Sequence, residues 1–194
     1  MSRTAARSPR RVTLRATLEW VAIVIVSLAV AFGAIALLSG FFSGRDQAGV
    51  SGGDTGPGLA YPDLGHAHLS PGQPHPRYNS DPPTSGAHVP EPVTANATEL
   101  GNDQLLEALE LGDVVIAYGS PTPPPALTAL TKSLGTPFTP ALAASGAAVI
   151  FDHRPGLPGI AALAWAHMAR VATPTDPLLR QFVQYWLAKG APGR

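Results

Sequence analysis

The longest apolar stretch of the chain lies near its N-terminus, from Leu18 to Phe42. After Glu19 it contains no charged residue, and it is long enough to cross a hydrocarbon core of roughly 30 Å as a helix. Trp20 lies at one end and two phenylalanines at the other, where aromatic side chains suit the membrane interfaces. The pattern predicts a transmembrane anchor at residues 17–42, with residues 18–42 in contact with the lipid bilayer.

Basic residues precede this anchor, since residues 1–16 hold five arginines and no acid. The positive-inside rule then places this tail in the cytoplasm and the rest of the chain outside. A cleaved signal peptide is the alternative, but its apolar core would be shorter, and no good small-x-small cleavage site follows this one. We therefore expect a single-pass protein of the cell membrane with an extracytoplasmic C-terminal part.

Residues 43–62 are rich in Gly, Ser and Asp and poor in large apolar residues. Such a segment cannot bury enough surface to fold alone, so it is predicted to be a flexible linker. Residues 63–194 are predicted to form a globular domain. Its first part, from Gly65 to His88, is dense in Pro, Gly and His, which favours an ordered loop over a helix.

Later segments of the domain show helical and strand periodicity. Helices are predicted over 104–111, with Asp103 as the cap, from the prolines at 123–125 to 134, and over 177–187. Buried strands are predicted over 114–118, 147–151 and 160–165. The strand–helix–strand order predicts a parallel first pair with a right-handed crossover, and the third strand is expected to run antiparallel to the second. The fold class is α/β, a small two-layer domain with a mixed sheet of about three strands and flanking helices.

The net charge and the cysteine content argue against several classes of function. The formal net charge is zero, which argues against a nucleic-acid-binding surface. The absence of cysteine excludes disulfides, thiolate metal sites and thiol catalysis. No feature of the sequence identifies a protein partner.

Histidines concentrate in the loop, because four of the six lie between Gly65 and His88. In an extended chain His66 and His68 point the same way, and two imidazoles on one side can bind Zn²⁺ or Cu²⁺. His75 and His88 would add ligands if the loop folds back. The alternative is a surface loop whose histidines face water.

Other candidate chemistry is weaker. Glu107 and Glu110 lie at i, i+3 on the first predicted helix, where they could be ligands or an acid/base pair, but a solvated helix face is favoured. Ser80 and Ser85 lie near His88, yet no nucleophile elbow is present, and turn-forming hydroxyls explain them better. No phosphate-binding glycine loop occurs. The sequence therefore predicts no enzyme.

The stretch Tyr78–His88, YNSDPPTSGAH, resembles the hallmark of the domain-of-unknown-function 3105 family. The segments GHAHLSPG, VVIAY, AAVIFDHRPGLPGIAALAW and FVQYWLAKGAP are similar to other parts of the family pattern, in the same order. The resemblance extends from Gly65 to the C-terminus. It implies a bacterial protein with one N-terminal membrane anchor and an extracytoplasmic domain.

The chain departs from this pattern on the helix after the loop. The family typically carries His-x-Leu-Glu-His-Gly there, and we infer that its two histidines form a metal centre with the loop histidines. In this chain Glu107 and Leu111 replace them, while Leu109, Glu110 and Gly112 are kept. Glu107 can still supply an oxygen ligand, whereas Leu111 cannot.

Two functional hypotheses follow. The first is a membrane-anchored extracytoplasmic binding or structural module without catalysis or a required cofactor. The second is a Cu or Zn site formed by His68, His88 and Glu107, with His66 and His167 as further candidate ligands.

Overall fold

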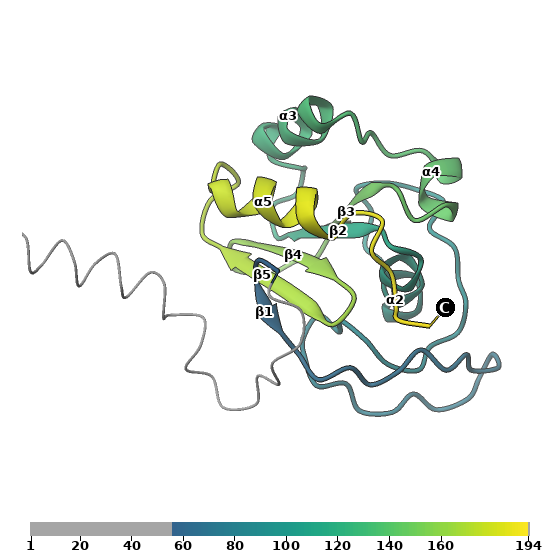
Figure 1. Ribbon diagram of the computed structural model, residues 1–194. Coiled ribbons are helices and arrows are strands. Elements are labelled where there is room, and N and C mark those ends of the chain that lie inside the picture. The colour runs from purple at the N-terminus through teal and green to yellow at the C-terminus, as the bar shows by residue number, and fades with distance from the viewer. Residues whose placement is uncertain (1–55, 194) are drawn as a thin grey trace, which may run out of the picture. The chain divides into compact units, whose positions relative to one another are not determined.

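The computed structural model describes residues 56–193 (Figure 1). The predicted transmembrane anchor lies outside this range. Within the described part of the chain, no helix is both long and apolar enough to cross a membrane. The elements are β1 (Leu59–Ala60), α2 (Asn102–Leu111), β2 (Val114–Tyr118), α3 (Pro125–Leu134), α4 (Pro140–Ala144), β3 (Val149–His153), β4 (Ile160–Ala164), β5 (His167–Val171) and α5 (Pro177–Trp186).

A five-stranded mixed sheet organises the domain, with strand order β1-β5-β4-β2-β3. The predicted parallel pair is β2 and β3, with Val114 opposite Val149. The third predicted strand, β4, is antiparallel as expected, but it pairs with β2 rather than with β3. The prediction of about three strands was too low. It missed β5 and the two-residue β1, which pair antiparallel on the other side of β4.

The prediction of two layers was wrong, because helices cover both faces of the sheet. In β2, Val115 and Ala117 pack into a core with the leucines of α2, whereas Val114, Ile116 and Tyr118 pack into a second core. The second core contains apolar residues of α3 and α5. In Figure 1, α5 lies along the upper side of the strands and α2 stands at the right. Strands buried on both faces explain the continuous apolar runs of the sequence.

The three predicted helices are confirmed with small changes at their ends. Asp103 is not the cap of α2: the N-cap is Gly101, whose backbone N–H donates to the side chain of Gln104 at 3.3 Å. The short α4 was not predicted, and its N-cap Thr139 accepts from the backbone N–H of Leu142 at 3.1 Å. At the N-terminal side, β1 falls inside the predicted linker of residues 43–62, so ordered structure begins before its end.

Residues 61–101 contain no helix, which agrees with the predicted ordered loop. They form the blue and teal loops at the lower right of Figure 1. Two isolated parallel bridges join distant parts: His68 with His88 and Thr98 with Asp152. The loop is therefore part of the folded domain, and it brings its histidines to α2.

Candidate metal centre

The segment Tyr78–His88, which we call the signature loop, is fixed by buried polar side chains. Thr84 and Ser85 are both fully buried. The Ser85 hydroxyl accepts from the backbone N–H of Leu64 at 3.1 Å, and the Thr84 carbonyl accepts from the backbone N–H of Ala166 at 2.8 Å. Buried polar groups of this kind need such partners. The Ser85 hydroxyl and the Thr84 carbonyl thus hold the loop in place.

Gly86 sets the direction of the histidine that ends the loop. Its φ is +129°, which side chains rarely allow, and a Cβ there would lie 3.0 Å from the ring of Tyr78. The Gly86 carbonyl lies 3.0 Å from Nδ1 of His88. Because a carbonyl can only accept, Nδ1 carries the proton and donates it. In neutral His88 the other nitrogen, Nε2, therefore holds a lone pair.

A short parallel bridge places His68 beside His88. The backbone N–H of Leu69 donates to the His88 carbonyl at 2.8 Å, and the His88 N–H donates to the Ala67 carbonyl at 3.1 Å. The two imidazole rings lie 5.5 Å apart in an edge-on arrangement. Segments twenty residues apart in the chain thus present two ring nitrogens to one place.

Helix α2 supplies two carboxylates opposite these rings. Glu107 and Glu110 lie one turn apart on the same side of the helix. The expectation of a solvated face was wrong for Glu110, which is 5% exposed. Its burial follows from the loop, which covers this side of the helix. Glu110 also lies against a third histidine, since Nδ1 of His66 is 3.5 Å from its Oε1.

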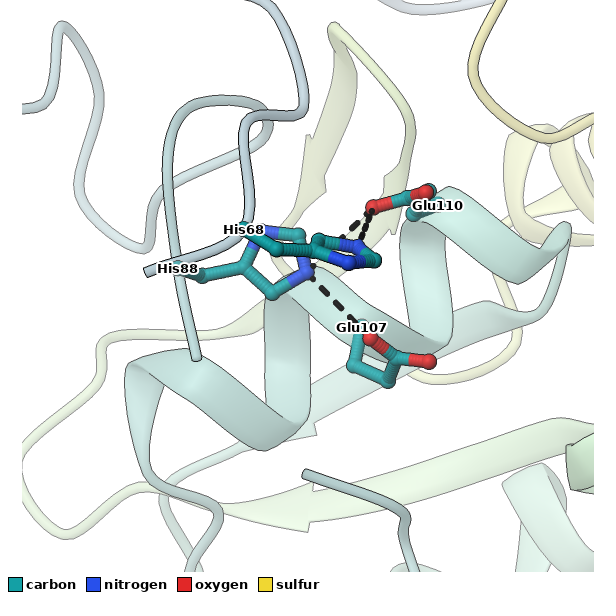
Figure 2. A group of neighbouring side chains, drawn as sticks. All are labelled: His68, His88, Glu107 and Glu110. Carbon is teal, nitrogen blue, oxygen red and sulfur yellow. Dashed lines mark hydrogen bonds and ion pairs between the residues drawn. The ribbon is translucent and has the colours of Figure 1, made fainter. Parts of the chain in front are cut away.

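His68, His88, Glu107 and Glu110 form a compact group that we call the His–Glu cluster. Figure 2 shows the two imidazoles between the two carboxylates. Nε2 of His68 lies 3.2 Å from Oε2 of Glu110, and Nε2 of His88 lies 3.4 Å from Oε2 of both glutamates. One nitrogen or oxygen from each residue falls within 4.8 Å of those from the other three.

Two buried polar atoms at the centre of the cluster have no hydrogen-bond partner in the described part of the chain. His88 is fully buried, and neither its Nε2 nor Oε2 of Glu107 makes a hydrogen bond within residues 56–193. A neutral His88 would point its lone pair at two carboxylate oxygens, which repel it and are costly to bury unpaired. Two species can resolve this: a proton on Nε2 or a cation among the four side chains.

Three of the six donor-to-donor separations in the cluster are close to those of a tetrahedral cation site. Zn²⁺ binds His nitrogen and carboxylate oxygen at about 2.0–2.2 Å, so neighbouring donors of a tetrahedral site lie about 3.3–3.6 Å apart. The three separations given above, 3.2, 3.4 and 3.4 Å, are close to this spacing. Two neutral imidazoles and two carboxylates also carry the charge that a divalent ion neutralises.

Asp103 holds the two halves of the cluster together. Its Oδ1 accepts from the backbone N–H of Val89, next to His88, at 2.8 Å. The same oxygen lies 2.8 Å from Nε2 of His75, so the predicted further ligand His75 pairs with Asp103 and is not part of the cluster. Asp103 is in the first turn of α2, one turn before Glu107. It thus joins the end of the signature loop to the helix that carries both glutamates.

The structure brings together three predicted ligands, His68, His88 and Glu107, and adds Glu110. His66 reaches the far oxygen of Glu110. His167 is not among the four: it lies in β5, donates from Nδ1 to the carbonyl of Trp165 at 2.9 Å and stacks on Trp186 at 3.8 Å. The i, i+3 spacing of the glutamates was the signal for Glu110, but only the covering loop shows its burial.

Comparisons with curated proteins and with solved structures find no significant match. A family model does match the chain over residues 70–193. The match includes His88 and both glutamates of the cluster, whereas His66 and His68 lie just before it. It spans most of the chain and most of the described domain. The chain therefore belongs to the DUF3105 family, described as proteins of unknown function.

Proposed function

We propose that this protein is a membrane-anchored extracytoplasmic module whose domain binds one divalent metal ion, Zn²⁺ in preference to Cu²⁺, in the His–Glu cluster. The observation that carries the proposal is the buried Nε2 of His88, which faces one carboxylate oxygen of Glu107 and one of Glu110 at 3.4 Å each. A cation at this point converts three mutually repelling acceptors into ligands. Three donor separations close to tetrahedral spacing favour zinc over copper(II), which prefers tetragonal sites.

The donor count supports a structural role rather than catalysis. Structural zinc sites are closed by four protein ligands, whereas catalytic sites keep one position open for water or substrate. The cluster supplies four residues. They come from the segment before the signature loop, from the end of that loop and from α2, so a bound ion would cross-link segments far apart in the chain. We accordingly propose a non-catalytic metal-stabilised domain.

The primary experiment measures metal and stability together. The untagged chain, purified without added metal, is analysed for metal content and then unfolded by heat with and without a chelator. We expect about one zinc per chain. If the ion is present at about a thousand times its Kd, its removal costs about 4 kcal/mol and lowers Tm by about 10 °C. Substoichiometric metal together with no Tm shift on adding Zn²⁺ or Cu²⁺ would contradict the proposal.

Matched variants locate the ion. His88→Gln and Glu110→Gln keep side-chain size and remove a ligand, so each should weaken zinc binding by about tenfold or more, equivalent to about 1.4 kcal/mol. Glu107→Gln should act in the same direction. His75→Gln is the control, because His75 pairs with Asp103 outside the cluster. If Glu110→Gln destabilises the domain equally with and without zinc, a protonated His88 rather than a metal holds the cluster together.

A further inference from the structure

We propose that a second site, separate from the His–Glu cluster, binds a small aromatic carboxylate. It is a cavity of about 530 Å³, which we call the aromatic pocket, within the 300–1,000 Å³ usual for small-molecule sites. It lies where β1, the β4–β5 turn and the C-terminal end of α5 meet. Its lining residues are Ala60, Tyr61, Pro62, Asp63, Trp165, Ala166, His167, Trp186, Lys189, Gly190 and Pro192.

Flat rings form much of the lining, and hydrogen bonds and ring stacking hold them in place. Trp186 donates from Nε1 to the carbonyl of Pro57 at 2.8 Å, and the ring of His167 stacks on it at 3.8 Å. His167 in turn donates from Nδ1 to the carbonyl of Trp165 at 2.9 Å. Trp165, His167 and Trp186 are buried, at 4%, 8% and 4% exposed. Preformed aromatic walls of this kind favour a flat, apolar ligand, because little has to be ordered on binding.

Lys189 places a positive charge at the edge of the pocket, so we expect the ligand to be an anion. Lys189 is exposed, and within residues 56–193 its ammonium has no carboxylate or hydrogen-bond partner. Its Nζ lies 3.4 Å above the ring of Tyr185 and 5.5 Å from the ring of Trp186, which is one wall of the pocket. The acidic lining residue, Asp63, is exposed, so solvent screens its charge, and its Oδ1 accepts from the backbone N–H of Gly65 at 2.9 Å. An ammonium next to aromatic walls is complementary to a ligand with a ring and a carboxylate.

The test compares two ligands that differ only in charge. Indole-3-acetate and indole-3-acetamide have the same ring and nearly the same shape. Each is titrated calorimetrically into the full-length chain in detergent, with a detergent blank subtracted. We expect indole-3-acetate to bind about tenfold more tightly, because only it forms a charged pair with Lys189. Lys189→Gln should remove this preference and leave the weaker binding of the amide unchanged.

Lys132→Gln is the matched control, since Lys132 is an exposed lysine on α3 and does not line the pocket. It should keep the full preference for the carboxylate. Equal affinity for the two ligands, no binding of either, or a preference that survives Lys189→Gln would each overturn the proposal. None of the four cluster residues lines the pocket. A failure of either indole to bind would therefore not change the zinc binding expected for the His–Glu cluster.

Discussion

Asp113 is another buried acid on the α2 side of the domain. It is 1% exposed, its Oδ1 accepts from the backbone N–H of Ala148 at 2.7 Å, and its Oδ2 makes no hydrogen bond within the described residues. Burial raises the pKa of Asp113 to about 7, and the Ala148 N–H opposes this only in part. At the scale of single residues, the fold therefore contains a carboxyl that prefers to stay protonated.

Replacing Asp113 with Asn should make the domain more stable at neutral and alkaline pH. The pKa of the unfolded carboxyl is near its ordinary value of 3.8, while the folded one keeps its proton to about pH 7. Wild-type stability therefore falls as pH rises between these values and levels off above them. Asn keeps the acceptor for Ala148 and does not ionise. The shift corresponds to at most about 4 kcal/mol.

The measurement is thermal unfolding of Asp113→Asn and wild type between pH 4.5 and 8.5. The difference in Tm, variant minus wild type, should grow up to about pH 7 and then stay constant. A difference that does not change with pH would show that the Asp113 carboxyl ionises alike in the folded and unfolded chains. Glu99→Gln serves as control, because Glu99 is exposed.

At the scale of elements, α2 connects the sheet, the signature loop and the C-terminal segment. Leu105, Leu106 and Leu109 are completely buried in the core on one face of the sheet. The other side of the helix carries both glutamates of the His–Glu cluster. Beyond the helix, the backbone N–H of Ala191 donates to the Glu110 carbonyl at 3.0 Å. The helix is therefore held from three directions, which limits how far its carboxylates can move.

Asp103→Ala should loosen the cluster without removing a ligand. The change breaks the bond from the Val89 N–H, which joins the signature loop to α2. Hydrogen bonds to charged groups contribute about 1.5–3 kcal/mol, so unfolding in urea should show a loss of this size. Zinc affinity should fall as well, because His88 is no longer aligned with the glutamates. Glu99→Ala changes an exposed acidic residue just before α2 and should change neither quantity. Unchanged zinc affinity in Asp103→Ala would contradict its positioning role.

At the scale of the whole molecule, the predicted anchor sets the side of the membrane on which the domain is expected to lie. Residues 17–42 are proposed to span the membrane with the arginine-rich tail inside. Protease added outside spheroplasts should then digest the domain, and detergent lysis should not be needed. An internal cytoplasmic protein provides the control for intact cells. A domain that is digested only after lysis would reverse the orientation.

Local pattern was sufficient for most of the elements. The α/β class, the helices of the described domain other than α4, the parallel pair β2–β3 and the strand β4 follow from apolar periodicity and from Gly and Pro positions, which act over a few residues. The strand β1 was missed because its two residues are too few to show an alternating pattern. The helix α4 was missed because its five residues make little more than one helical turn. The third layer was missed although the strands are apolar throughout, which is the pattern of strands covered on both faces. The sequence does not show which helix covers which face.

The sequence by itself determined the family, the helix and strand alternation, the apolar N-terminal stretch and a surplus of histidines before α2. Only the tertiary structure decided which of them meet. A parallel bridge puts His68 beside His88, the loop buries Glu110, and His167 turns toward Trp186 instead. The physical reason is that burial and donor spacing depend on contacts between distant segments, such as His68 and Glu110, which are 42 residues apart, whereas sequence patterns report only the neighbours along one helix or strand.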